Sequence, residues 1–228
     1  MKLAGYYAIL DVAAGELGAP GLIARVTARA DRLLEASPCM LQLRAKEAPP
    51  AQLAVLARSI LPAARRARVP VCVNDRLDVA LAVGAEAVHL GQDDLPLADA
   101  LPLAEARLRT GSRLLIGVST HNLTQAGAAV AGGADYIGFG PIFATATKAN
   151  PDPVVGTAML RQLAGGVAAS VPVVAIGGIT LDRLAEIAAC GAAAAALIGA
   201  IEMAVDPVAA GLAVNLAFSK APTPSRVR

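Results

Sequence analysis

The chain has 228 residues, a length that suits one large domain with a buried core or two small domains. Its net charge of +2 excludes the strongly basic surface of a general nucleic-acid-binding protein. Hydrophobic residues make up 56% of the chain and aromatic residues only 3%, so the apolar content is mainly alanine, valine and leucine, as in helices packed on a buried parallel sheet.

Neither of the two long uncharged stretches is expected to cross a membrane. Residues 114–134 carry a polar cluster at their centre, and residues 163–181 contain two Gly-Gly pairs, whereas a spanning helix needs about 20 predominantly apolar residues. The N-terminus lacks a signal-peptide pattern, so a cytoplasmic location is the expectation. Cys39, Cys72 and Cys190 lie far apart in apolar sequence and are expected to be buried structural thiols.

Short apolar runs typical of β-strands alternate along the chain with longer alanine-rich segments typical of helices. The predicted strands span residues 6–10, 39–43, 69–73, 87–90, 114–118, 136–139, 171–176 and 194–198. The predicted helices lie near residues 21–36, 50–68, 76–84, 97–109, 122–132, 157–169, 181–190 and 206–218. Thr180 is expected to cap the helix that follows it, and Gly191 suits the left-handed position at the end of that helix.

The order of these elements predicts the fold. Strands that alternate with helices pair in parallel through right-handed crossovers, and eight such units favour a closed barrel, for which about 250 residues is usual. An open doubly wound sheet is the alternative, but the glycine fingerprint expected after its first strand is missing. We therefore predict an α/β fold with a single (β/α)8 TIM barrel over residues 1–218 and a disordered tail over residues 219–228.

In such a barrel the active site lies at the C-terminal ends of the strands, where this chain carries several polar side chains. Gln42, Arg44 and Lys46 share one face at the end of the second predicted strand, because side chains alternate with period two. Three long polar side chains on one face predict an anion clamp. A solvated loop without a binding role is the alternative.

Carboxylates follow the third and fourth predicted strands. Asp75 comes after Asn74, and Asp93 and Asp94 stand side by side after the fourth strand. Mg²⁺ usually takes one or two protein carboxylates together with substrate phosphate oxygens and water, so these neighbouring strand ends predict a Mg²⁺ site on a polyphosphate. Asp75 could instead cap the next helix, and spacing alone does not choose between Asp93 and Asp94.

The loops after the last three predicted strands suit phosphate recognition. Thr145 and Thr147 offer hydroxyl donors and Lys148 a point charge, in a loop long enough to close over a substrate; a plain turn is the alternative. Glycines at the ends of the last two strands would let backbone amides approach a phosphate closely. These glycines are Gly177, Gly178 and Gly199.

The two histidines are left without an assigned role. A histidine in an apolar strand is more often a satisfied core residue than a catalyst. Neither His89 nor His121 has the partners that would indicate a nucleophilic triad or a zinc site.

Several motifs resemble those of the thiamin phosphate synthase family and follow the family's order between Tyr7 and Ile201. They are LQLRAK at 41–46, VNDR at 73–76, VHLGQDDLP at 88–96, GVSTH at 117–121, DYIGFGP at 135–141, TATK at 145–148 and AIGGI at 175–179. The resemblance implies a (β/α)8 transferase that joins a pyrimidine pyrophosphate to a thiazole phosphate, releases pyrophosphate and uses Mg²⁺. Its partners would be small phosphorylated substrates, not nucleic acid or membrane, and homo-oligomer formation stays open.

The same likeness implies roles for individual residues. The pyrophosphate would be held by Arg44, Lys46, Asn74 and Lys148, and Mg²⁺ by Asp75 and Asp94. The pyrimidine or the leaving group would be positioned by Gln42, Ser119, Thr145 and Thr147. Backbone amides at Gly178, Ile198 and Gly199 would bind the thiazole phosphate. The residues closest to the catalytic step would be Arg44, Lys46, Ser119 and Lys148.

The implied chemistry needs no protein nucleophile, because pyrophosphate leaves readily once Mg²⁺ and fixed cations neutralise its charge. The aminopyrimidine can stabilise the resulting cation until the thiazole nitrogen captures it. Two departures from the family pattern concern the thiazole side: the alanine run 192–196, and Gly199 where the family usually has serine. A thiazole tautomerase with the same barrel and a non-catalytic barrel that binds a thiamin precursor are the alternatives.

Overall fold

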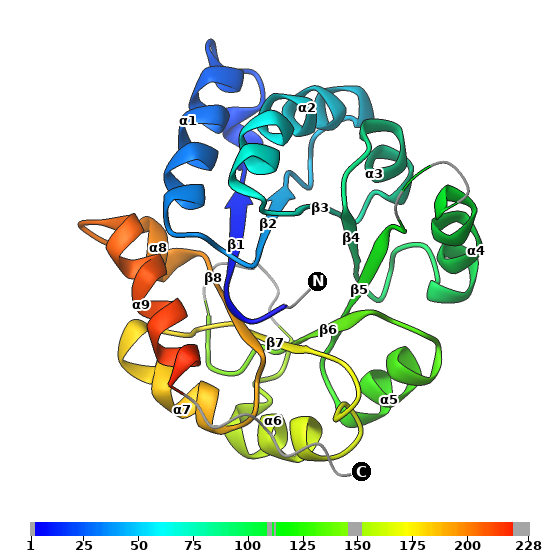
Figure 1. Ribbon diagram of the computed structural model, residues 1–228, viewed down its shortest axis with the longest axis vertical. Helices are drawn as coiled ribbons and strands as arrows, with labels where there is room; N and C mark the ends of the chain where they lie inside the picture. The colour runs from blue at the N-terminus through cyan, green and yellow to red at the C-terminus, as the bar shows by residue number, and fades with distance from the viewer. Residues whose placement is uncertain (1–2, 109–110, 112, 146–151, 221–228) are drawn as a thin grey trace.

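The computed structural model describes residues 3–108, 111, 113–145 and 152–220. It confirms the predicted (β/α)8 barrel (Figure 1). In pairing order, the strands are β1 (Gly5–Asp11), β2 (Met40–Arg44), β3 (Val71–Asn74), β4 (Ala87–Leu90), β5 (Leu115–Thr120), β6 (Tyr136–Phe139), β7 (Val173–Ile176) and β8 (Ala194–Leu197). Every pair is parallel, and β8 closes the barrel on β1 with Ala196 opposite Tyr7.

Helices form an outer ring around these strands (Figure 1). They are α1 (Leu22–Glu35), α2 (Pro50–Ala67), α3 (Leu77–Val83), α4 (Leu97–Leu108), α5 (Leu123–Ala131), α6 (Gly156–Gly165), α7 (Leu184–Ala189), α8 (Gly199–Glu202) and α9 (Pro207–Ser219), with 3₁₀ turns η1 (Ala14–Glu16) and η2 (Leu181–Arg183). Within the described residues no helix is long and apolar enough to cross a membrane. Lys220 follows α9, and the rest of the predicted tail, residues 221–228, lies outside the described part of the chain.

Two local features differ from the sequence-based expectation. Thr180 precedes the 3₁₀ turn η2, and among the described residues its side chain accepts no capping hydrogen bond from that turn. The helix α8 after β8 is not predicted, since four residues are too few to show a helical hydrophobic period. Gly191 does take the expected left-handed conformation after α7, with a φ of 91°.

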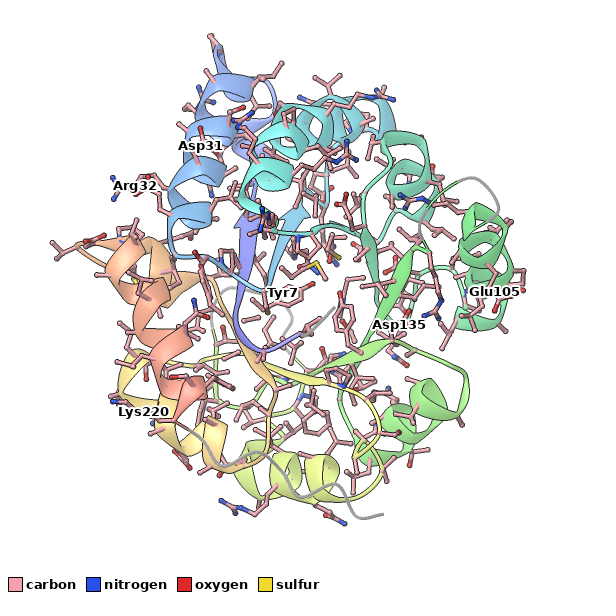
Figure 2. All side chains as sticks on the ribbon, viewed as in Figure 1. Tyr7, Asp31, Arg32, Glu105, Asp135 and Lys220 are labelled. Atoms are coloured by element: carbon pink, nitrogen blue, oxygen red, sulfur yellow. The ribbon has the colours of Figure 1, made fainter. Side chains whose placement is uncertain are left out.

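Side chains along each strand alternate between the barrel interior and the helix layer. Leu41 and Leu43 of β2 belong to the apolar cluster between strands and helices, whereas Met40 belongs to a second cluster inside the barrel. This interior cluster contains Leu3, Tyr7, Ile9, Met40, Cys72, Ala87, Tyr136, Val174, Ala194 and Ala196. Figure 2 shows Tyr7 within the ring of strands and Asp31 outside it.

The interior becomes polar toward the C-terminal ends of the strands. Beyond the apolar cluster, the positions with the same alternation are Gln42 and Arg44 on β2, Asn74 on β3, His89 on β4 and Ser119 on β5. A TIM barrel carries its active site at this end. The alternation of side chains along each strand therefore places these polar groups where a substrate would bind.

Candidate active site

A cavity of about 730 Å³ opens at the polar ends of the strands. It is lined by eleven predicted site residues: Gln42, Arg44, Lys46, Asn74, Asp75, Asp94, Ser119, Thr145, Gly178, Ile198 and Gly199. The other two, Thr147 and Lys148, lie outside the described residues. The barrel therefore gathers at one cavity candidates that are far apart in the sequence.

The cationic side of the cavity is built on β1 and β2. Arg44 Nη1 donates to Asp11 Oδ1 over 2.6 Å, and the carbonyl oxygen of Asp11 accepts a second hydrogen bond of 2.6 Å from Arg29 Nη2. Lys46 follows β2 in an exposed loop. A carboxylate thus holds one edge of the Arg44 guanidinium, which leaves its other donors for an anion.

Asp75 and Asp94 form the acidic side. Asp75 directly follows β3 in the left-handed conformation, with a φ of 63°, and its amide donates to His89 O over 2.8 Å. Asp94 Oδ2 accepts a hydrogen bond of 2.6 Å from the Gly91 amide. Burial and the neighbouring Asp94 carboxylate raise the pKa of Asp75 to about 6, against the opposing influence of nearby cations. The two carboxylates therefore repel each other, and a divalent cation between them would relieve that repulsion.

The surroundings of these carboxylates bear on two alternatives left open by the sequence. Asp93 is exposed, whereas Asp94 is half-buried and interacts with Asp75. Arg76, not Asp75, directly precedes the first turn of α3. Within the described residues no group of three or more His, Cys, Asp or Glu side chains could hold a metal ion. A pair of carboxylates would need phosphate oxygens and water to complete a coordination shell, which is the usual arrangement for Mg²⁺.

A chain of buried hydrogen bonds forms the floor of the cavity. Gln42 Nε2 donates to Tyr7 Oη over 3.2 Å, and Tyr7 Oη lies 2.9 Å from Tyr136 Oη. His89 bridges the far end of this chain, with Nδ1 at 3.2 Å from Tyr136 Oη and Nε2 at 2.9 Å from Ser119 Oγ. Burial lowers the pKa of His89 to about 4, so the imidazole is neutral near pH 7.

Two glycines make room for the rings in this floor. A Cβ on Gly117 would lie 2.1 Å from Tyr136 Cζ, and one on Gly138 would lie 3.0 Å from His89 Cε1. A side chain at either position would displace a ring of the hydrogen-bonded chain. Glycine at these interior positions of β5 and β6 is therefore part of the construction of the site.

The loops after β6 and β7 pack against each other on the opposite side of the cavity. Gly177 and Gly178 take positive φ angles of 94° and 62°, and a Cβ on Gly178 would lie 2.4 Å from the carbonyl oxygen of Ala144. The guanidinium of Arg183 lies 4.0 Å above the Phe143 ring. These contacts hold the start of the loop that carries Thr145.

His121 braces the rim of the cavity. Its Nδ1 lies 2.6 Å from the carbonyl oxygen of Gly140, and its Nε2 lies 3.5 Å from Asp152 Oδ2. The side chain thus joins the ends of β5 and β6 to the segment before α6.

The cysteines follow the expectation in two of three cases. Cys72 and Cys190 are buried, whereas Cys39 is partly exposed, and all three are free. Burial raises the pKa of Cys72 to about 11 and that of Cys39 to about 12. These thiols are therefore protonated at neutral pH, as structural thiols are.

Sequence reasoning missed three residues of the site. Asp11 lies just beyond the predicted strand 6–10 but ends β1, and Tyr7 and Tyr136 are predicted only as strand residues, whereas their hydroxyls lie in the floor. Their interior position follows from strand alternation. The one signal in the sequence was Gly117, which makes space for the large Tyr136 ring inside the barrel.

Comparisons with known proteins agree with this geometry. The sequence matches a family model described as thiamine monophosphate synthase over residues 19–201. A thiamine-phosphate synthase from Anaeromyxobacter dehalogenans is 48% identical over 178 residues, which cover 78% of this chain and 76% of that protein. One from Chloroflexus aurantiacus is 46% identical over 171 residues, 75% of each chain. A solved structure of thiamine phosphate pyrophosphorylase from Pyrococcus furiosus gives a TM-score of 0.80 at 30% identity and covers 96% of this chain and 98% of that one.

Proposed function

The chain belongs to the thiamine monophosphate synthase family and is a transferase, and from that premise we propose its substrates and mechanism. It joins 4-amino-2-methyl-5-hydroxymethylpyrimidine pyrophosphate to 4-methyl-5-(2-hydroxyethyl)thiazole phosphate and releases pyrophosphate. The observation that carries this proposal is the cavity, because a single space is lined by cations, by a carboxylate pair and by glycine-rich strand ends. Two differently phosphorylated substrates need those three features together.

The pyrophosphate is bound at the β2 and β3 ends. Arg44 offers the guanidinium edge that Asp11 does not occupy, and Lys46 and Asn74 line the same cavity. Lys148, outside the described residues, is assigned to this group by family likeness. Fixed cations favour the leaving group, because the charge on pyrophosphate increases as its bond to the pyrimidine methylene breaks.

Asp75 and Asp94 fit Mg²⁺. Their mutual repulsion and their oxygen-only donor set match a hard divalent cation that completes its shell with phosphate oxygens and water. When bound, the ion neutralises charge on the pyrophosphate. Asp75 and Asp94 would hold the ion at the ends of β3 and β4.

The chemical step is a dissociative displacement. The carbon–oxygen bond between the pyrimidine methylene and pyrophosphate breaks, and its electron pair leaves with the pyrophosphate. The thiazole nitrogen then donates its lone pair to the methylene cation and forms the carbon–nitrogen bond. Gln42, Ser119, Thr145 and, by family likeness, Thr147 position the pyrimidine or the leaving group. The two substrates fill the cavity and so exclude water that would compete for the cation.

The thiazole phosphate is bound at the ends of β7 and β8. Gly178 and Gly199 line the cavity there together with Ile198, and the short helix α8 follows β8. Loops after the seventh and eighth strands and a short extra helix are the usual phosphate site of this fold. Backbone amides supply the contacts, so the missing serine hydroxyl at Gly199 removes one contact and not the site.

The proposal is tested by substrate omission. Purified protein with both substrates and Mg²⁺ should form thiamin phosphate, detected after oxidation to fluorescent thiochrome. Omission of either substrate should abolish the signal, and the pyrimidine monophosphate should not replace the pyrophosphate. Equal product from the monophosphate would contradict the proposed role of the leaving group.

Asp11→Asn should raise the KM for the pyrimidine pyrophosphate about tenfold, because a charge-assisted hydrogen bond that holds Arg44 is weakened. Steady-state kinetics with the thiazole phosphate saturating measures the change. Asp31→Asn is the matched control, since Asp31 is exposed on α1, outside the ring of strands (Figure 2). Equal KM values for the two variants would show that Asp11 does not position Arg44.

Gly199→Ser should lower the KM for the thiazole phosphate up to about fivefold, because it adds one hydrogen bond to the phosphate. The side chain fits: a Cβ at Gly199 would lie 3.7 Å from Met203 Cε, an ordinary contact. Gly199→Ala adds volume without a hydroxyl and should bind the thiazole phosphate no more tightly than the wild type. Identical KM values for the serine and alanine variants would mean that no hydroxyl is recognised there.

A further inference from the structure

The floor of the cavity is a continuous path of hydrogen bonds through five strands. It runs from Gln42 on β2 to Tyr7 on β1, Tyr136 on β6, His89 on β4 and Ser119 on β5. Ser119, the last residue of the path, is the only one whose hydroxyl group has a role in the proposed reaction. The other four side chains determine how that hydroxyl is oriented.

The first half of the path has a definite direction. Gln42 Nε2 is an amide nitrogen and can only donate, so Tyr7 Oη accepts. Burial raises the pKa of both Tyr7 and Tyr136 well above the ordinary value, so each phenol keeps its hydrogen. The hydrogen of Tyr7 then goes to Tyr136 Oη, 2.9 Å away.

Tyr136 donates the next hydrogen bond of the path, to His89. Its own hydrogen has two neighbouring acceptors, Cys72 Sγ at 3.6 Å and His89 Nδ1 at 3.2 Å. Sulfur is a weak acceptor, whereas an unprotonated imidazole nitrogen is a good one. Tyr136 therefore donates to Nδ1, and a nitrogen that accepts this bond carries no hydrogen, so the ring hydrogen of His89 lies on Nε2.

The tautomer of His89 decides how Ser119 is used. With its hydrogen on Nε2, His89 donates to Ser119 Oγ over 2.9 Å. Ser119 accepts that bond and keeps its own hydrogen for a group in the cavity that it lines. The opposite tautomer would take the serine hydrogen and leave only lone pairs toward the substrate.

We propose that His89 is a positioning residue that makes Ser119 a hydrogen-bond donor to the departing pyrophosphate, and that Gln42, Tyr7 and Tyr136 set the required tautomer. This inference rests on the proposed function for the identity of the acceptor. A donor that is oriented in advance stabilises an oxygen whose negative charge grows in the transition state more than it stabilises the ground state. It also explains why a serine beside a histidine is not a nucleophile here: the histidine has no free nitrogen to take the serine proton.

The packing supports a fixed path. Backbone at Gly117 and Gly138 lies against the Tyr136 and His89 rings, where any Cβ would collide or crowd. The planes of the two rings are tilted 33° to each other, with centroids 5.5 Å apart. A flip of the His89 ring, which would exchange the contacts of Nδ1 and Nε2, is therefore opposed by the surrounding strands.

The tautomer is measured directly by nitrogen NMR of the full chain, labelled with ¹⁵N-histidine and carrying no affinity tag. The chain has only two histidines, and the spectrum of His121→Gln assigns the remaining signals to His89. We expect a neutral ring with its hydrogen on Nε2 at neutral pH. A hydrogen on Nδ1, or on both nitrogens, would overturn the proposal. This result does not depend on turnover, so it separates failure of this inference from failure of the proposed function.

A double-mutant cycle tests the effect on the reaction. His89→Phe should lower kcat about tenfold with little change in KM, and His89→Gln, which can place an amide hydrogen near the position of Nε2, should recover most of that loss. In a Ser119→Ala background, His89→Phe should not lower kcat further, because the hydroxyl through which His89 acts is absent. An equal loss in both backgrounds would mean that His89 does not act through Ser119.

Tyr136→Phe is the second variant, used if His89→Phe does not fold. Its NMR spectrum should show that His89 no longer carries its hydrogen on Nε2. An unchanged tautomer would overturn the role of the path.

Discussion

Asp94→Asn should lower kcat for thiamin phosphate formation by at least about 10²-fold while the barrel stays folded. The variant removes one of the two negative charges that would hold Mg²⁺ on the pyrophosphate, so the leaving group departs with its charge poorly neutralised. An asparagine oxygen can still accept the hydrogen bond from the Gly91 amide, so the loop after β4 keeps its local contact. The expected signature is a large loss of kcat at an unchanged unfolding temperature.

The adjacent carboxylate provides the matched control. Asp93 is exposed beside Asp94, and Asp93→Asn removes the same charge from the same loop. Asp93 lines the same cavity, but its side chain is exposed to solvent. We expect the kcat of this variant to stay within about threefold of the wild type, since charges screened by solvent contribute little. If both variants lose activity equally, the effect is one of general charge, and the assignment of Asp94 to the metal is wrong.

Gly177→Ala should lower the free energy of unfolding by about 3 kcal/mol. Two independent costs add: the positive φ of 94° disfavours any side chain, and the new Cβ would lie 2.5 Å from the backbone Cα of Pro141. Because that neighbour is backbone, it cannot swing aside. For a domain of this size the loss corresponds to a fall in Tm of roughly 6–12 °C.

Gly18→Ala is the control for this prediction. A Cβ at Gly18 would meet nothing within 4 Å, so we expect a change in Tm of no more than about 2 °C. Chemical denaturation of both variants gives the free energies. A Gly177→Ala protein as stable as Gly18→Ala would mean that the loops after β6 and β7 do not pack as tightly as described.

The barrel could be predicted because its strands are short apolar runs in a regular series. The strand over Tyr136–Phe139 has the predicted bounds, and even the alanine strand Ala194–Leu197 was placed by its position after seven others. Features that depend on a few residues were not predictable in the same way. The helix α8 has four residues, and the turn after Thr180 is 3₁₀ and not a full α-helix, so neither has a hydrophobic period to detect.

The candidate site was predictable to the extent that it consists of polar side chains at strand ends. Arg44, Asn74 and Asp75 follow from that rule alone, and the structure brings them to one cavity. The ion pair between Arg44 and Asp11 depends on strands β1 and β2 lying side by side in register, which a linear sequence does not display. Gly178 was indicated by the glycines at the strand ends, whereas the role of Ile198 came from family likeness alone, because a backbone amide carries no side-chain signal.

Magnesium dependence of product formation tests the central claim most directly. Protein stripped of metal with EDTA is incubated with both substrates, and thiamin phosphate is followed as thiochrome before and after addition of excess Mg²⁺. The account predicts no product in EDTA and full recovery with Mg²⁺ in the wild type, and little recovery in Asp94→Asn. Product formation in EDTA at the wild-type rate would contradict a metal-assisted departure of pyrophosphate from this cavity.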